Sequence, residues 1–300
     1  MREELFKNCT LCPRKCNVNR LEGKRGYCGM DGTIRAARAA LHMWEEPCIS
    51  GKKGSGAVFF SGCGLRCCFC QNRDIAIGDS GKEITVERLA EIFLELQEKG
   101  AANLNLVTGA HYVPHIISAL ELARGKGMNL PVVYNSSGYE SVETIRRLDG
   151  YVDVYLPDMK YMEPELAAAF SNARDYPQAA QSAIAEMMRQ TGPCQFAENG
   201  YIKRGTIVRH LILPGHTKNS IAVLKYLYRT YGEDIFISVM NQYTPVWKNE
   251  KFPELNRKVT RREYEKVLDA AIELGIENGY FQEGETAEES FIPAFDYEGV

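Results

Sequence analysis

Short apolar runs alternate regularly with amphipathic helical patterns from residue 57 onward. The runs have the length of buried strands and stand at 57–60, 104–107, 131–134, 152–156, 206–213 and 235–241. Apolar residues in the segments between them recur with the period of an α-helix. Strands that alternate with helices in this way form parallel sheets. We therefore predict an α/β fold with six βα units, fewer than the eight of a closed barrel.

The first 50 residues differ from this pattern. They hold five of the ten cysteines and show little periodicity, apart from residues 32–44, which can form a short strand or hairpin. The sequence SGKKGSG at 50–56 indicates a turn or linker. We predict a cysteine-rich metal-binding segment over 1–50 and a core domain over 51–300.

Composition and charge narrow the range of partners. Hydrophobic residues at 45% and charged residues at 25% are ordinary for a globular protein, and no run is long enough to span a membrane. The net charge of −3, with six acids and no lysine or arginine in 282–300, disfavours nucleic acid, although a local basic patch remains an alternative. The start MREELFKNCT has no apolar signal region, so we expect a cytoplasmic protein. In that compartment clustered cysteines bind metal more often than they form disulfides.

Four cysteines stand within eight residues in SGCGLRCCFCQN, at 61–72, directly after the first predicted strand. If Cys68 is set aside as a small packed residue, Cys63, Cys67 and Cys70 have the spacing CxxxCxxC. Three thiolates suit an iron–sulfur cluster. A four-iron cluster held by three cysteines keeps one iron open, as catalytic zinc sites keep one position open. A zinc site or a chance grouping is the alternative.

This spacing, with the aromatic Phe69 before the last cysteine, resembles the signature of the radical SAM superfamily. The resemblance implies that Cys63, Cys67 and Cys70 hold a [4Fe-4S] cluster whose open iron binds S-adenosyl-L-methionine (SAM). It further implies an anaerobic oxidoreductase. One electron cleaves SAM to a 5′-deoxyadenosyl radical, which abstracts hydrogen from the substrate.

Longer segments, among them NLVTGAHYVPHI, VDVYLPDMKY and LNRKVTRREYE, resemble the PflX-type branch, whose members are homologues of pyruvate formate-lyase activating enzyme. The resemblance covers nearly the whole chain. It implies a partial (β/α)6 TIM-like barrel with the cluster at its mouth, and reduced flavodoxin or ferredoxin as electron donor. Two motifs of the activating enzymes are absent, because TGAH at 108–111 replaces a Gly-Gly-Glu segment and MNQY at 240–243 replaces an ending that contains histidine. His111 is either catalytic or a buried, hydrogen-bonded histidine.

Polar residues follow several predicted strands, and the carboxyl ends of parallel strands meet at one edge of a sheet. The resemblance implies that Asn135 and Ser136 lie near the SAM carboxylate, and that Asp158 lies near a monovalent cation. Asp158 and Lys160 point to the same side of an extended segment and are the candidate catalytic pair. Arg209 can hold a carboxylate through two parallel hydrogen bonds. Helix capping by the first pair and a surface salt bridge in the second are the alternatives.

The remaining cysteines form a second group near the N-terminus. Cys9, Cys12, Cys16 and Cys28 suit a closed four-cysteine site, which binds either structural zinc or a second iron–sulfur cluster. Their spacing differs from that of ferredoxins, which slightly favours zinc. We expect Cys48 and Cys194 to be packed residues without a shared role.

Six βα units cannot close as eight do, so one side of the mouth is expected to stay open. Residues 161–206 follow the fourth strand and could line this opening. We therefore predict a protein or peptide substrate, for example a glycine on a loop that pairs with an open sheet edge. The alternatives are radical SAM modification of a peptide or an RNA, and a non-catalytic iron–sulfur or zinc module for electron transfer.

Overall fold

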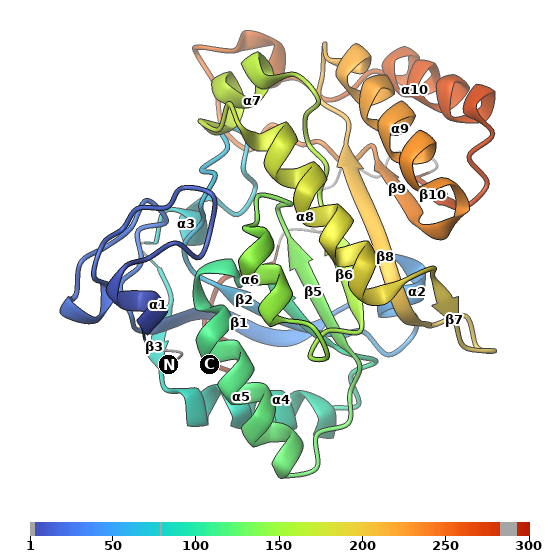
Figure 1. Cartoon of the computed structure of the whole chain (residues 1–300). Coiled ribbons are helices and arrows are strands. Elements are labelled where there is room, and N and C mark those ends of the chain that lie inside the picture. Colours follow the sequence, from blue (N-terminus) through green and yellow to red (C-terminus); the bar gives the residue numbers. More distant parts are fainter. Residues whose placement is uncertain (1–3, 79, 283–292) are drawn as a thin grey trace.

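Parallel strands form the centre of the molecule, and most of the helices lie around the outside of the sheet (Figure 1). The computed structural model describes residues 4–78, 80–282 and 293–300. The order of the strands within these residues is β10-β9-β8-β6-β5-β4-β2-β1-β3, and β7 pairs with β8 outside this order. The strands are β1 (Ile34–His42), β2 (Ser55–Phe60), β3 (Lys82–Ile84), β4 (Leu104–Val107), β5 (Val132–Ser136), β6 (Val154–Pro157), β7 (Gln195–Phe196), β8 (Ile202–Leu211), β9 (Phe236–Met240) and β10 (Gly279–Phe281).

The six predicted βα units are confirmed, because every predicted strand is present and a helix follows each of them along the chain. β10 is an additional short strand that pairs in parallel with β9. No helix in the described part of the chain is both long enough and apolar enough to cross a bilayer. The helices are α1 (Glu4–Lys7), α2 (Pro47–Ser50), α3 (Arg73–Ala76), α4 (Val86–Glu98), α5 (Val113–Gly125), α6 (Val142–Arg147), α7 (Pro164–Ser171), α8 (Tyr176–Thr191), α9 (Thr217–Tyr231) and α10 (Arg261–Leu274).

The sheet is open, with β10 at one end of the strand order and β3 at the other. The predicted partial barrel is therefore confirmed. β1 comes from the cysteine-rich first 50 residues and pairs antiparallel with β2 in the same sheet. The division into two domains at residue 50 stays a prediction.

Local sequence signals explain where several elements begin and turn. The side chain of Thr85 accepts a hydrogen bond from the backbone amide of Arg88 and caps α4. Thr260 and Glu263 form a capping box at the start of α10. The turn around residues 199–200, with the sequence Asn-Gly, joins β7 to β8, which pair antiparallel.

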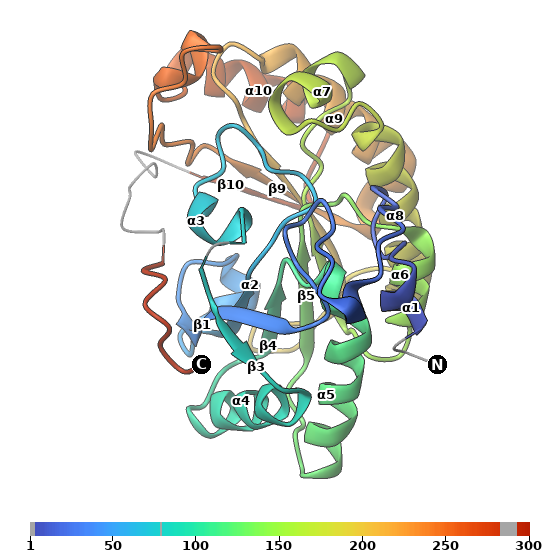
Figure 2. The same ribbon diagram turned by 90° about the vertical axis from the view of Figure 1, so that its left-hand side faces the viewer.

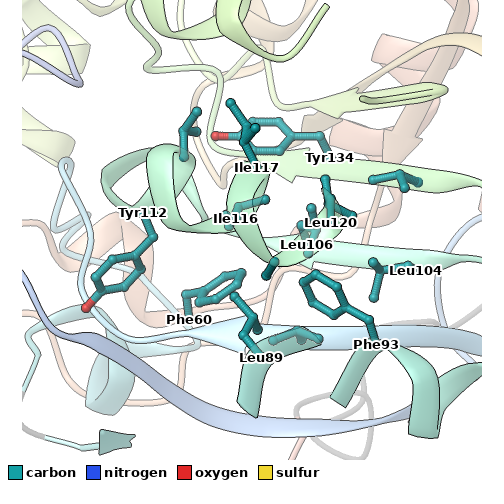
Figure 3. Packing of buried hydrophobic residues seen from close by; sticks show 14 of the residues in the cluster. Phe60, Leu89, Phe93, Leu104, Leu106, Tyr112, Ile116, Ile117, Leu120 and Tyr134 are labelled. Atoms are coloured by element: carbon teal, nitrogen blue, oxygen red, sulfur yellow. The ribbon is translucent and has the colours of Figure 1, made fainter. Parts of the chain in front are cut away.

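A large apolar core lies between α4, α5 and the strands β2, β4 and β5 (Figure 3). Phe60, Phe93, Leu106 and Ile116 in this core are almost fully buried. Burial of a side chain of this size contributes roughly 1.5–3 kcal/mol each to folding. This packing fixes the carboxyl ends of β2 and β4, where the candidate site lies.

The segment that follows β1 enters the barrel from its amino-terminal end. β1 runs antiparallel to β2, so His42 at its end lies opposite Ser55 at the start of β2. Cys48 and Ile49 then pack among the inward-facing residues of β5, β6 and β8. Cys48 is thus a packed residue, as predicted, and half-buried Cys194 packs against the same cluster.

Residues 293–300 cover the outer edge of β1 (Figure 2). The amide of Tyr297 donates to the carbonyl of Ala37 at 3.1 Å, and the amide of Ala39 donates to the carbonyl of Glu298 at 2.8 Å. This edge of the sheet therefore already pairs with backbone of the same chain. Most of the acidic stretch at 282–300 lies outside the described residues.

Candidate active site

A cavity of about 260 Å³ lies where the parallel strands end. Its lining comes from the loop after β2 and from residues at the carboxyl ends of β4, β5, β6 and β8. The predicted residues on its wall are Cys63, Cys67, Cys70, Asn135, Ser136, Asp158, Lys160 and Arg209. The fold therefore brings together two groups that are as much as 146 positions apart, from Cys63 to Arg209.

None of residues 161–206 is on the wall of this cavity, although all of them belong to the described chain. Apolar residues of α7 and α8 join a buried cluster with α9, α10 and Leu65 of the cysteine loop, and Cys63, Cys67 and Phe69 pack against it. α7 therefore supports the cysteine loop from outside the cavity. That residues 161–206 line the open side of the mouth stays a prediction.

The three cysteines form one group of thiols on the loop between β2 and α3. Burial raises the pKa of Cys67 to about 11, and the neighbouring charge of Cys63 contributes in the same direction. Burial also raises the pKa of Cys70, with further contributions from Cys67 and Cys63. The amide of Leu65 donates to the sulfur of Cys63 at 3.4 Å, and the hydroxyl of Ser171 donates to the sulfur of Cys67 at 2.9 Å.

The donor set of this loop fits an iron–sulfur cluster. Among the described residues no three His, Cys, Asp or Glu side chains converge on a point where one metal ion could bind. A cluster does not need that convergence, because each cysteine binds a different iron. Neighbouring hydrogen bonds to the sulfurs are one of the features that tune such clusters.

Cys68 is oriented toward different surroundings. It lies with Trp247 and Asn249 on the wall of two other cavities, one of which Cys67 and Cys70 also line, and it does not line the cavity at the strand ends. Its amide donates to the carbonyl of Phe170 at 2.8 Å, and its carbonyl accepts from the indole of Trp247 at 3.0 Å. Cys68 is therefore a packed residue that, unlike the other three cysteines, does not face the cavity at the strand ends.

Asp158, Lys160 and Arg209 form a charged network at the strand ends. Lys160 Nζ lies 2.5 Å from Asp158 Oδ2, and Arg209 Nε donates to Asp158 Oδ1 at 3.2 Å. The side chains of Lys160 and Asp158 are only 17% and 15% exposed, which excludes an ordinary surface salt bridge. Burial alone would raise the pKa of Asp158, but the charges of Lys160 and Arg209 outweigh it, so the pKa is lowered.

Lys160 links this network to the cysteine loop. Burial would lower its pKa, but the negative charge of Asp158, followed by that of Cys67, raises it. The same ammonium acts to lower the pKa of Cys67, against the larger effect of burial. A cation at this position therefore favours the thiolate form, which is the form that binds metal.

The structure gives no support to the predicted monovalent cation beside Asp158. Its two carboxylate oxygens already face Lys160 and Arg209. Two positive charges therefore compensate this one carboxylate. A further cation would have to displace one of them.

Glu45 is a residue of the site that the sequence did not reveal. Its Oε2 accepts from Arg209 at 3.1 Å, and its Oε1 accepts from the side-chain amides of Asn105 and Asn135 at 3.0 and 3.1 Å. The side chain is only 7% exposed. The neighbouring Glu46 is also buried, and burial raises its pKa. Two adjacent acids in the otherwise apolar stretch HMWEEPC were the available signal.

Arg209 is consequently held on three sides. Its Nη2 donates to Asn135 at 2.7 Å, in addition to the contacts with Asp158 and Glu45. A guanidinium has five N–H donors. At most two of them remain for a ligand, so the side chain is held in place before any ligand binds.

His111, and His210 next to Arg209, lie outside the cavity wall. His111 is buried and its Nε2 lies 2.7 Å from the carbonyl of Ser61, so it supports the start of the cysteine loop. Burial, with the nearby charge of Arg20, lowers the pKa of His111 to about 3. His210 is buried on the other face of β8 and contacts the carbonyl of Met159 and the hydroxyl of Ser220.

Two backbone positions at the mouth are unusual. Thr108 lines the cavity with a φ of 59°, which is rare for a β-branched residue and occurs mostly at constrained sites. Gly138 follows β5 with a φ of 75°, and a Cβ there would lie 2.1 Å from the carbonyl oxygen of Asp158. The close approach of these two backbone segments sets the position of the Asp158 side chain.

We expect Gly138→Ala to destabilise the protein more than the replacement of a glycine of similar φ whose new Cβ would lie in open space. The left-handed backbone alone costs roughly 1–2 kcal/mol for alanine, and the contact with Asp158 adds to it. Gly150→Ala is the matched control, because its φ is 80° and no atom lies within 4 Å of the new Cβ. Urea unfolding of both variants measures the difference, and equal costs would contradict the proposed role of this contact.

Comparison with known proteins identifies relatives of this chain. A family profile described as the radical SAM superfamily matches residues 57–227. An uncharacterized protein of Methanocaldococcus jannaschii is 30% identical over 276 residues, which span 90% of this chain and 75% of that protein. A pyruvate formate-lyase-activating enzyme of Clostridium pasteurianum is 28% identical over 113 residues, which span 36% of this chain and 46% of that enzyme.

One solved structure shows the same architecture. HydG, a maturase of the [FeFe]-hydrogenase, superposes with a TM-score of 0.50 at 15% identity, over 79% of this chain and 54% of HydG. At this identity the likeness concerns the fold. The chain thus spans about half the length of HydG and of the activating enzyme that it matches.

Proposed function

This chain belongs to the radical SAM superfamily, and we propose that it is an enzyme that reductively cleaves SAM at a [4Fe-4S] cluster held by Cys63, Cys67 and Cys70. The observation that carries the proposal is the shared cavity, whose wall includes these thiols together with Asp158 and Lys160. When bound, the cluster and SAM supply a 5′-deoxyadenosyl radical that abstracts hydrogen from the substrate. The more specific likeness to pyruvate formate-lyase activating enzyme has support from a match over 113 residues, and membership of the PflX-type branch is proposed from the sequence motifs alone.

The protein's own residues have separate roles in this proposal. Lys160 and Arg209 provide positive charge for the carboxylate of SAM, and Asp158 holds these two cations in position on the cavity wall. Asn135 and Ser136 add uncharged hydrogen-bonding groups on the same wall. Lys160 also favours the thiolate of Cys67, so one side chain acts on both the cluster loop and the cofactor pocket.

An anaerobic assay tests the proposal. The protein is loaded with iron and sulfide, reduced with dithionite and given SAM. We expect 5′-deoxyadenosine and methionine in equal amounts, because one cleavage releases one molecule of each. If the protein carries a full [4Fe-4S] cluster at Cys63, Cys67 and Cys70 and still forms neither product, the proposed activity is ruled out.

The proposed substrate is a protein or a peptide. The sheet is open, and the edge of β1 already pairs with backbone at Tyr297 and Glu298. An added strand on a sheet edge is a common way to bind extended peptide. A substrate loop that enters from this side would displace residues 293–300 or lie beside them. Deuterium that passes from a labelled protein into 5′-deoxyadenosine supports this substrate class, and transfer only from an RNA or a free metabolite contradicts it.

The proposed electron donor is reduced flavodoxin or ferredoxin. A second cavity next to the cysteine loop is lined by Cys67 and Cys70 and by exposed basic side chains, with one acid among them. The basic residues are Arg66, Arg73, Lys248 and Lys251. Such a patch on a chain of net charge −3 suits an acidic protein partner that docks close to the cluster. The cytoplasmic location stays a prediction from the sequence.

We expect the double variant Lys248→Glu/Lys251→Glu to slow reduction by flavodoxin by about tenfold at low salt, because charge steers association and salt screens it. Reduction by dithionite, a small molecule, should not change. Lys225→Glu on α9 is the matched control at an exposed position that does not line this cavity. Stopped-flow absorbance measures the rates, and an equal effect of the control variant would contradict a specific docking surface.

A further inference from the structure

The N-terminal cysteines form a second group of thiols. Cys9 and Cys12 lie on a tight turn, in which the amide of Asn17 donates to the carbonyl of Cys9 at 3.0 Å and the amide of Lys15 donates to the carbonyl of Cys12 at 3.0 Å. Lys15 and Asn17 have φ values of 43° and 55°, which side-chain-bearing residues rarely adopt. Through these hydrogen bonds the turn places Asn17 next to Cys9 and Lys15 next to Cys12.

Two of the four sulfurs lie beside one glycine. A Cβ on Gly26 would lie 3.5 Å from the sulfur of Cys16 and 3.7 Å from the sulfur of Cys28. The hydrogen bond between Asn17 and Cys9 places the backbone of Cys9 next to the residue that follows Cys16. Cys12 stands on the same turn, so the fold gathers the four cysteines in one small part of the segment.

We propose that Cys9, Cys12, Cys16 and Cys28 hold a second iron–sulfur cluster rather than zinc. Zinc would bring the sulfurs to about 2.3 Å from one point, and no three such side chains converge on a single-ion site in the described chain. The Cys63, Cys67 and Cys70 thiols likewise form no single-ion site among the described residues. Thiols that gather in this way suit a group in which each cysteine binds a different iron.

The surroundings of the second group also suit a cluster. The amide of Tyr27 donates to the sulfur of Cys16 at 3.2 Å, and such hydrogen bonds set cluster potentials. Arg20 is 1% exposed, and its Nη1 lies 3.9 Å from the sulfur of Cys9. The buried guanidinium offsets part of the negative charge that four thiolates would bring.

The second group lies directly against the loop of the first. The sulfur of Cys12 lies 3.7 Å from the position of a Cβ on Gly64, which is the residue after Cys63. Arg14 Nε donates to the carbonyl of Gly64 at 2.8 Å. Two clusters at these positions would be close enough to couple magnetically. The inference rests on the proposed function only in taking Cys63, Cys67 and Cys70 as the first cluster site.

The test counts metals in the full chain after anaerobic loading with iron, sulfide and zinc together. The variant Cys63→Ala/Cys67→Ala/Cys70→Ala should keep about two to four irons with acid-labile sulfide, as four-cysteine clusters hold. Cys12→Ala/Cys28→Ala should keep about four irons and no second set. Electron paramagnetic resonance of the reduced wild type should show coupling that is absent from both variants.

Gly26→Ala is a further variant that keeps the test decisive if the cysteine variants do not fold. It removes no ligand, and the φ of Gly26 is not in the left-handed region, but its Cβ would enter the space beside two of the sulfurs. We expect it to lose the second set of irons and to keep the first. One zinc per chain that Cys12→Ala/Cys28→Ala loses, or no iron in the triple variant, would overturn the inference. Iron kept by the triple variant would support it even if the wild type formed no 5′-deoxyadenosine.

Discussion

Replacing Cys63, Cys67 or Cys70 by alanine is expected to remove the brown absorbance of the first cluster and to reduce 5′-deoxyadenosine formation to the level of a blank. These cysteines share one cavity wall, and Cys67 and Cys70 each respond to the charge of the other thiols. A cluster bound through three thiolates has no substitute ligand when one is lost. The nearby Asp158 is already compensated by Lys160 and Arg209 and is not positioned as a replacement.

Cys68→Ala is the matched control for this series. Its thiol faces the side of Trp247 and Asn249, away from the cavity at the strand ends, so the variant should keep both the absorbance and the activity. Any absorbance from the second cysteine group must be subtracted. The variant Cys63→Ala/Cys67→Ala/Cys70→Ala keeps that group and supplies the baseline. A Cys68→Ala protein without the first cluster would mean that the ligand assignment is wrong.

Much of the fold could be predicted because the buried strands carry their own pattern. The strands at 104–107 and 131–134 are continuous apolar runs, as expected for a sheet covered on both faces. β10 was missed because it is only three residues long and all three are partly exposed. The pairing of residues 297–298 with β1 depends on a contact across most of the chain, which no local pattern reveals.

The candidate site was predictable where it follows from sheet geometry. Asn135, Asp158 and Arg209 lie near the carboxyl ends of neighbouring strands, so a parallel sheet brings them together. Glu45 reaches the same place from the other end of the barrel, on a segment whose path depends on β1 being antiparallel. Its partner Arg209 is 164 positions away, and only the packed structure reveals that pair.

The largest expected effect on stability comes from Arg209→Ala. The guanidinium lies between the carboxylates of Asp158 and Glu45. The exposed fraction of the side chain is 16% for Arg209, 15% for Asp158 and 7% for Glu45. Removal of one partner leaves buried charge without compensation, which costs about 3–5 kcal/mol. Urea unfolding at neutral pH measures this loss. Arg261→Ala is the matched control, since that side chain is 90% exposed and its pair with Glu265 should contribute less than about 1 kcal/mol.

A second substitution separates lost charge compensation from lost packing. If the uncompensated carboxylate of Glu45 causes most of the cost, then Glu45→Gln in the Arg209→Ala background should restore stability, although the same change alone lowers it. The amide can still donate to or accept from Asn105 and Asn135, which now contact its Oε1. Residues in one network of this kind commonly show interaction energies of about 0.5–3 kcal/mol. Additive losses in the double variant would mean that Arg209 stabilises the barrel through packing, and that the charges at its mouth act independently.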